Sequence, residues 1–244
     1  MPAPKPSDRF QTTAWSLIQA MKNRDASQYL PAMNRFIAGY WKPVFYFLRA
    51  RGCALHQAED LTQEFFARCL EGDWIQRADP RRGKFRALLL TVLKGFLSDQ
   101  GPKRAPRQKK FERQLVSIEG LVGDAERAYE PATNETPDEI FMKRWAAALV
   151  ESVLARLRED CERLDRPLWY QVFVAVHYPA SHDERPSQQA LAGRLGVSRE
   201  QVRYGLEQAT QRFRQHLRQE VRDQVGPKAD VGQEIRELMA LLGG

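Results

Sequence analysis

Apolar residues recur three and four positions apart along most of this chain, and the strict alternation of a half-buried strand is absent. The repeat is clearest over residues 58–71, where apolar side chains fall on one side of a helix and polar side chains on the other. It predicts further helices at residues 15–21, 33–41, 44–51, 85–97, 139–157, 168–178, 188–195 and 199–218, and one short helix after Gly226. The pattern therefore predicts an all-α protein.

Glycine and proline divide these helices into two groups. The pair Gly101-Pro102 and the later Pro106 interrupt the helical repeat. Acidic residues with several glycines and prolines follow, and this composition is typical of a linker. The predicted parts are a first domain at residues 1–114, an acidic linker at 115–138, a second domain at 139–225 and a C-terminal tail at 226–244.

Charge is distributed unevenly along the chain. The 244 residues include 38 Lys and Arg against 31 Asp and Glu, a net charge of +7. Residues 77–113 hold twelve bases and three acids (+9), residues 114–165 twelve acids and six bases (−6), and residues 185–222 eight bases and three acids (+5). Two basic regions on either side of an acidic one suggest two contacts with a polyanion. The alternative is a solvated surface that is basic by chance.

Composition also limits the class of protein. The three cysteines are far apart and odd in number, which disfavours a disulfide framework and fits a reducing cytosol. The first six residues lack the apolar core of a signal peptide, and no apolar run approaches the ~20 residues of a membrane helix. We expect a cytoplasmic protein without a membrane contact.

Motifs for catalysis, metals and cofactors are missing from the sequence. The four histidines form no cluster with the scattered cysteines, so no metal is expected. There is no phosphate-binding loop, no dinucleotide fingerprint and no nucleophile elbow. We therefore expect neither a cofactor nor an enzymatic activity.

The stretch 188–206 has the positional features of a helix-turn-helix. Leu191 and Leu195 would hold the first helix, Gly196 suits the turn, and Ser198 is a good N-cap for the second helix. In such motifs the first residues of the second helix reach base edges in the major groove. The DNA contacts expected here are Ser198, Arg199, Gln201, Arg203, Tyr204 and Arg212. The alternative is an ordinary helical hairpin.

Three strings in the first domain resemble a known family. They are Ala58-Glu-Asp-Leu-Thr-Gln-Glu-Phe-Phe-Ala-Arg68, Asp79-Pro-Arg-Arg-Gly-Lys-Phe-Arg86 and Leu88-Leu-Leu-Thr-Val-Leu-Lys-Gly-Phe-Leu-Ser-Asp99. Together with Thr13-Ala-Trp-Ser-Leu17 and the later helix-turn-helix pattern, they resemble the extracytoplasmic-function sigma factors of RNA polymerase. The resemblance extends from about residue 12 to residue 225. Leu88 and Gly95 stand where many members have Trp and Asn.

This resemblance implies partners and sites. The first domain would be region 2-like, docking on the β′ clamp helices of the polymerase core and capturing the melted −10 strand. The second domain would be region 4-like, lying at the β flap and reading the −35 duplex. The residues implied in core binding are Asp60, Gln63, Glu64 and Arg68. The resemblance also admits an anti-sigma factor as a partner, and it implies a monomer when the protein is free.

The basic stretch after residue 73 suits the melted strand. Single-stranded DNA needs phosphate neutralisation and flat groups on which bases stack. The residues expected to contact the −10 strand are Trp74, Arg81, Arg82, Lys84, Arg86 and Lys94. Phe85 and Phe96 are expected in the core instead.

Three functions therefore compete. The main hypothesis is an alternative sigma factor that directs promoter-specific initiation of transcription. The second is a stand-alone helix-turn-helix regulator, whose first domain senses a ligand or dimerises. The third is an enzyme that acts on nucleic acid, against which the missing catalytic constellation argues.

Overall fold

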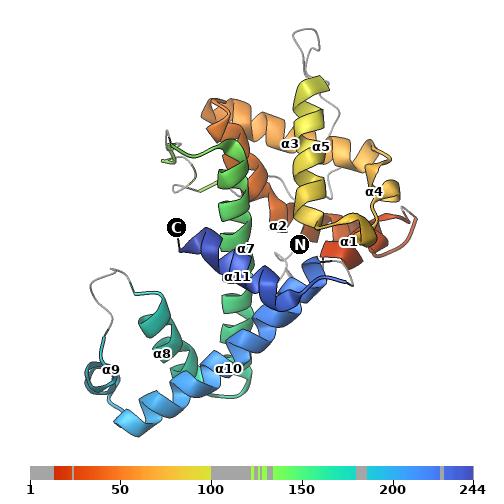
Figure 1. Ribbon diagram of the computed structural model, residues 1–244. Coiled ribbons are helices and arrows are strands. Elements are labelled where there is room, and N and C mark those ends of the chain that lie inside the picture. Colours follow the sequence, from red (N-terminus) through yellow and green to blue (C-terminus); the bar gives the residue numbers. More distant parts are fainter. Residues whose placement is uncertain are drawn as a thin grey trace. The chain divides into compact units, whose positions relative to one another are not determined.

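The computed structural model describes residues 14–23, 25–99, 122–123, 126, 128–130, 134–179, 186–225 and 228–243. Every regular element in these ranges is a helix, and no strand occurs in them, which confirms the all-α prediction. The helices are α1 (Ala14–Met21), α2 (Tyr29–Ala50), α3 (Leu55–Glu71), α4 (Trp74–Arg77), η2 (Pro80–Arg82), α5 (Phe85–Asp99), α7 (Pro137–Arg163), α8 (Pro167–His177), α9 (Gln188–Leu195), α10 (Arg199–Gln224) and α11 (Val231–Leu242) (Figure 1).

The chain divides into two compact units. The first unit comprises residues 1–149 and 221–244, and the second unit comprises residues 150–220. These boundaries differ from those expected at residues 114, 138 and 225. The first turns of α7, the end of α10 and all of α11 group with the N-terminal helices. One reason is a buried hydrogen bond of 2.8 Å from the Tyr40 hydroxyl to the Gln224 side chain, which joins α2 to the end of α10.

Aromatic rings build the core of the first unit. Phe36 of α2 lies 5.3 Å from Phe66 and 6.0 Å from Phe85, in both cases edge to face. Helix α5 crosses α3 (Figure 1), and Phe96 meets Phe65 at 5.6 Å. Phe85 and Phe96 are both buried, which confirms their expected place in the core.

Helix α2 corrects one prediction. The sequence predicted two helices separated at Pro43, but α2 runs without interruption from Tyr29 to Ala50. A proline inside a helix removes one backbone hydrogen bond and costs about 3 kcal/mol. Here Pro43 itself is buried, and so are Tyr40 and Trp41 before it and Val44 and Phe45 after it. Burial of apolar side chains on both sides of the proline outweighs the local penalty.

Some described residues of the expected linker pack against helices. The Tyr129 ring lies 4.4 Å from the Tyr46 ring, and Arg49 donates a hydrogen bond of 3.0 Å to the Tyr129 carbonyl. Thr136 and Glu139 form a reciprocal cap at the start of α7, since each side chain accepts from the other residue's backbone N–H. The rest of the linker and the basic run Lys103–Arg113 lie outside the described residues.

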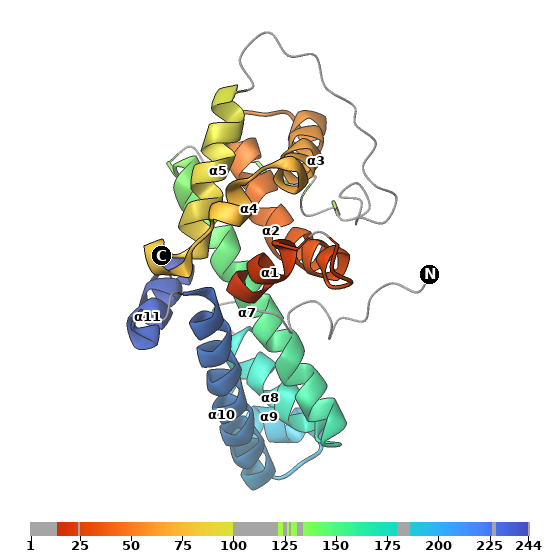
Figure 2. The ribbon, with the colours of Figure 1, turned by 90° about the vertical axis from the view of Figure 1, so that its right-hand side faces the viewer.

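The second unit has two connected apolar clusters. One joins α7, α8 and α10 through Leu157, Cys161, Phe173 and Ala209. The other joins α8, α9 and α10 through Val172, Leu191, Ala192 and Val202. Figure 2 shows α8 lying between α7 and α10. Gly205 lets α10 approach α8 closely, because a Cβ atom there would lie 2.9 Å from the Trp169 ring.

All three cysteines are free thiols. Cys69 in the first unit and Cys161 in the second unit are fully buried, and burial raises the pKa of both thiols. Cys53 is half-buried, and its thiol pKa is also raised by burial. In the described parts of the chain, no helix is long and apolar enough to cross a bilayer.

Candidate nucleic-acid interface

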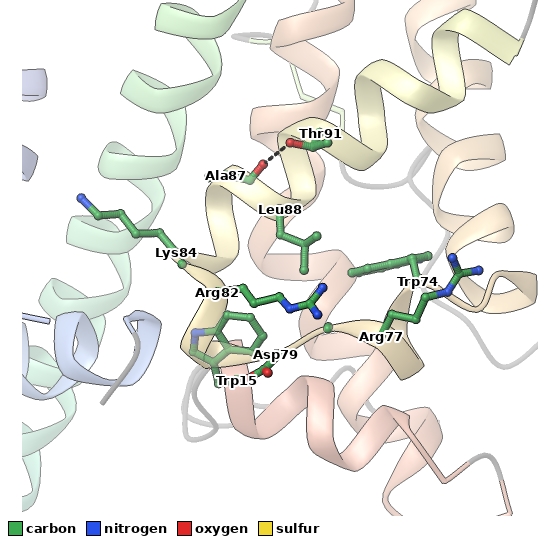
Figure 3. A pocket seen from close by; sticks show the side chains of 11 residues that line it. Trp15, Trp74, Arg77, Asp79, Arg82, Lys84, Ala87, Leu88 and Thr91 are labelled. Carbon is green, nitrogen blue, oxygen red and sulfur yellow. Dashed lines mark hydrogen bonds between the residues drawn. The ribbon is translucent and has the colours of Figure 1, made fainter. Parts of the chain in front are cut away.

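A pocket of about 470 Å³ lies between α1, α4, η2 and the first turns of α5 (Figure 3). Two indole rings, Trp15 and Trp74, and the Leu88 side chain form its apolar part. The guanidinium-bearing side chains Arg77 and Arg82 stand at the same pocket. We call this the α5 pocket; its lining residues are Trp15, Trp74, Arg77, Ala78, Asp79, Arg82, Gly83, Lys84, Ala87, Leu88 and Thr91.

The loop beside the pocket has a defined local structure. The Asp79 side chain caps η2 by accepting a hydrogen bond of 2.9 Å from the Arg81 N–H, and Pro80 occupies the first helical position. Gly83 then takes a backbone φ of 141°, a conformation that favours glycine. The sequence Asp79-Pro-Arg-Arg-Gly83 therefore fixes the path of the chain into α5.

Asp79 also pairs with the Arg81 side chain. Arg81 Nη2 lies 2.9 Å from Asp79 Oδ2, and Arg81 Nε lies 3.0 Å from Oδ1. These hydrogen bonds from Arg81 lower the pKa of Asp79 to about 2. Arg81 remains exposed, but its guanidinium already has a carboxylate partner.

The two indoles differ from the sequence expectation. Trp74 begins α4 and is half-buried, with its ring 6.2 Å from Phe36 and 6.4 Å from Phe85. The Trp74 ring, expected to stack on a base, therefore also lies near two rings of the core. Trp15 was not among the expected site residues: it is 8% exposed, and its Nε1 is buried without a hydrogen-bond partner in the described structure. The periodicity of α1 indicates that Trp15 is buried but gives no sign of the pocket.

Lys84 and Arg86 are occupied by α11. Lys84 Nζ pairs with Glu234 and, at 2.7 Å, with Glu237. Arg86 Nη2 lies 2.8 Å from Glu234 Oε2, and the Arg86 guanidinium lies 4.3 Å from the centre of the Trp145 ring. Figure 3 shows Lys84 pointing away from the pocket interior.

Burial changes the interpretation of Arg86. It is only 4% exposed, although the sequence placed it on the DNA-binding surface. In this conformation its guanidinium stabilises the packing of α5, α7 and α11 and is closed to a phosphate. The helical spacing contains a signal for this, since Arg86 precedes the buried Leu89 and Leu93 by three and seven positions.

The remaining bases of this region are exposed. Lys94 forms an ion pair with Asp138 of α7. Arg77 and Arg82 form no ion pair with any residue that the structure describes. Among the residues expected to contact the −10 strand, Arg82 is therefore exposed and has no acidic partner in the described chain. Arg77 has the same two properties and also lines the pocket.

The polar face of α3 contains the four residues that the resemblance assigns to core binding. Asp60 is exposed, whereas Gln63, Glu64 and Arg68 are half-buried. Arg68 Nη2 lies 3.4 Å from Asp99 of α5, and its guanidinium lies 5.7 Å from the Phe96 ring. These two contacts tie the end of this face to α5, while Asp60 is left accessible at its beginning.

The segment from α9 to α10 packs at the positions that the sequence indicated. Leu191, Ala192 and Val202 are buried, and Gly196 adopts the left-handed conformation with a φ of 66°. Ser198 and Gln201 cap α10 reciprocally: Gln201 N–H donates to the Ser198 hydroxyl at 3.1 Å, and Ser198 N–H donates to Gln201 Oε1 at 2.8 Å. Ser198 and Gln201 were both expected to contact DNA, and both also cap the start of α10.

The first two turns of α10 present an exposed basic surface. Arg199, Gln201 and Arg203 are exposed, and Tyr204 is 54% exposed. Neither arginine forms an ion pair with a described residue. Backbone and Ser198 hydrogen bonds lower the pKa of Glu200, so this carboxylate stays charged among them. We call Arg199, Gln201, Arg203 and Tyr204 the α10 surface.

Arg212 lies apart from the α10 surface. It is half-buried, its guanidinium lies 4.8 Å from the Trp169 ring centre, and it donates a hydrogen bond of 3.0 Å to the Gln208 side chain. The Trp169 contact holds Arg212 against α8, and the Gln208 hydrogen bond is made within α10. Arg214, two positions later, is exposed.

Within the described ranges, no group of three or more His, Cys, Asp and Glu side chains could hold a metal ion. His216 is engaged in a contact of 2.7 Å with Asp160 of α7. Comparison of the chain with protein-family models, with curated proteins and with solved structures gives no match.

Proposed function

We propose that this protein is a sigma factor that binds the core of RNA polymerase in the cytoplasm and directs it to particular promoters. The observation that carries the proposal is the presence of two different basic sites in one chain. The α10 surface suits duplex DNA, and the α5 pocket with its two indoles suits an unpaired strand. A protein that starts transcription must bind its promoter in both forms.

The argument for duplex binding rests on α9 and α10. A short turn at Gly196 and a capped helix start bring Arg199, Gln201 and Arg203 to the exposed beginning of a helix. Arginine can bind guanine, and glutamine adenine, through two hydrogen bonds in the major groove. We interpret α9 and α10 as a helix-turn-helix and α10 as its recognition helix.

The argument for single-strand binding rests on the α5 pocket. An unstacked base needs an apolar cavity with flat walls, and its flanking phosphates need cations nearby. The pocket offers the indoles of Trp15 and Trp74 and the exposed Arg77 and Arg82. We propose that this pocket receives a base of the melted −10 strand.

Polymerase binding is assigned to the polar face of α3. Asp60, Gln63, Glu64 and Arg68 share that face, and the resemblance places the clamp helices of β′ there.

The test is co-purification with bacterial RNA polymerase core, followed by run-off transcription on genomic fragments. We expect a stable complex and new start sites. Asp60→Lys should weaken core binding without changing the binding of duplex DNA, whereas Glu151→Lys, which reverses an exposed carboxylate in the second unit, should change neither. Sequence-specific duplex binding without any core binding would overturn the proposal in favour of a stand-alone regulator.

A further inference from the structure

Helix α11 is a short amphipathic helix in the C-terminal part of the chain. Asp230 caps it by accepting hydrogen bonds from the N–H groups of Gly232 and Gln233 at 2.8 and 3.2 Å. Its two acidic residues, Glu234 and Glu237, are three positions apart and so lie on one face. Figure 2 shows α11 beside the first turn of α5, in the same unit.

Both carboxylates meet Lys84, the residue directly before α5, and Arg86 in its first turn. Lys84 Nζ contacts Glu234 and Glu237, and Arg86 contacts Glu234 at 2.8 Å and Glu237 at 3.8 Å. Lys84 pairing also lowers the pKa of Glu237, so its carboxylate stays ionised at neutral pH. Two carboxylates thus take the positions at which a polyanion would otherwise contact this lysine.

The attachment of α11 is limited in area. Only Glu234 and Leu238 of this helix are buried. Met239 and Leu242 are 49% and 39% exposed, so much of its apolar surface stays in water. The Lys84–Glu237 pair is itself partly exposed, with 34% and 43% of the two side chains accessible. Exposed pairs contribute little and weaken with salt, so a polyanion can compete with this one.

We propose that α11 is an acidic cover that competes with single-stranded DNA for Lys84 at the beginning of α5. The inference rests on the proposed function, in which the neighbouring α5 pocket receives the melted strand. Binding of the strand displaces the Glu237 carboxylate from Lys84. Because only Glu234 and Leu238 of α11 are buried, loss of the Glu237 contact loosens the whole helix on α5.

The other role that these contacts allow is a permanent brace, in which α11 stays bound and holds α5 in place. The two roles predict opposite effects of removing the Glu237 charge. A cover that competes with DNA makes the protein bind DNA more weakly, so its loss strengthens binding. A brace that organises α5 makes binding stronger or leaves it unchanged, so its loss weakens binding or has no effect.

The experiment measures binding of a fluorescein-labelled oligothymidylate to the full chain by anisotropy at low salt. Glu237→Gln leaves Glu234 in place for Arg86, so the buried pair is kept, and Lys84 loses one of its two carboxylate partners. We expect this variant to bind the oligonucleotide about two- to fivefold more tightly, the range of a partly exposed ion pair. Glu151→Gln removes one exposed carboxylate in the second unit and should bind like the wild type.

A double-mutant cycle separates the effect of the Glu237–Lys84 pair from the general effect of changing the net charge. Lys84→Gln should weaken binding, and Glu237→Gln added to it should then produce no gain, because the lysine for which Glu237 competes with DNA is absent. Hydrogen exchange gives a second readout without any substitution. Amides of α11 should lose protection when the oligonucleotide is added.

The outcomes separate this inference from the proposed function. Equal or weaker binding by Glu237→Gln, or unchanged protection of α11, would overturn the cover while the sigma-factor proposal stands. If no variant binds the oligonucleotide, both the cover and the single-strand site are wrong. Run-off transcription with polymerase core then decides the proposed function by itself.

Discussion

The basic beginning of α5 and the basic beginning of α10 look alike in the sequence but differ in structure. At α5, Arg81, Lys84, Arg86 and Lys94 all have carboxylate partners, and Arg86 is buried. On the α10 surface, Arg199 and Arg203 are exposed and form no ion pair with a described residue. Net charge therefore identifies both regions, but only tertiary structure separates bases that are free to bind from bases that are already paired.

The two kinds of base should respond oppositely to substitution. Removing a paired, buried base leaves a carboxylate without its partner and destabilises the fold. Removing an exposed base leaves the fold unchanged and affects a ligand alone. Four predictions concern these two regions, beginning with the largest expected effect.

Arg86→Ala should reduce the free energy of unfolding by about 3 kcal/mol, because the buried Glu234 would lose its buried charge partner and keep only the half-buried Lys84. Urea denaturation of the full chain, followed by tryptophan fluorescence, measures the change. Arg203→Ala is the matched control, with an expected change within about 0.5 kcal/mol. Similar losses for the two variants would remove the distinction between the two regions.

Arg199→Ala and Arg203→Ala should each weaken specific duplex binding by about 1–3 kcal/mol, if each side chain makes a bidentate base contact. Binding is measured with promoter duplexes recovered from run-off transcription and with random duplexes of the same length. Arg214→Ala, at an exposed position further along α10, should reduce binding to both kinds of duplex equally. A uniform loss for Arg199 and Arg203 as well would assign all three to phosphates.

Ser198→Ala should destabilise the fold by about 1 kcal/mol, because the N–H of Gln201 would lose its acceptor. Ser198→Gly should cost only a few tenths of a kcal/mol, since glycine is tolerated at an N-cap. Thermal unfolding of both variants checks the order. If Ser198→Ala weakened duplex binding while stability stayed unchanged, this residue would belong to the α10 surface.

The carboxyl group of Asp79 should titrate at a pH of about 2, because Arg81 stabilises its charged form. An unfolded chain has an aspartate pKa of about 3.9. The stabilisation by this pair is therefore complete above the unfolded value and is lost as the pH falls through about 2. Carbon-13 NMR measures the midpoint. Arg81→Ala should move it back toward the ordinary value, and an ordinary midpoint in the wild type would contradict the pair.

Local patterns predicted much of this fold. Helical spacing identified α3, α5 and α9, and the burial of Leu191 and Val202 follows from it. The spacing did not predict that α2 continues through Pro43, where burial of the side chains on both sides outweighs the local cost of the proline. Sequence patterns do not distinguish a paired base from an unpaired one, because the partner can be distant in the chain. Glu234 of α11, the partner of Arg86, lies 148 positions after it. Long-range pairs of this kind leave no periodic signal.

The candidate site was predicted in part. The exposed residues at the beginning of α10 follow from its N-cap and from the spacing of its buried side. The contribution of Trp15 to the α5 pocket does not follow from any local pattern, because it depends on how α1 packs against α4 and α5. Capping and periodicity are local, but a pocket between elements is a property of tertiary packing.

Cys69 and Cys161 give each unit a natural reporter of its own opening. Each thiol is fully buried, and burial raises its pKa, so a thiol reagent reacts with it only after the surrounding helices separate. Cleavage and mass analysis can read the two labelling rates from a single sample. The unfolding of the two units can therefore be timed independently, without introducing any label or substitution.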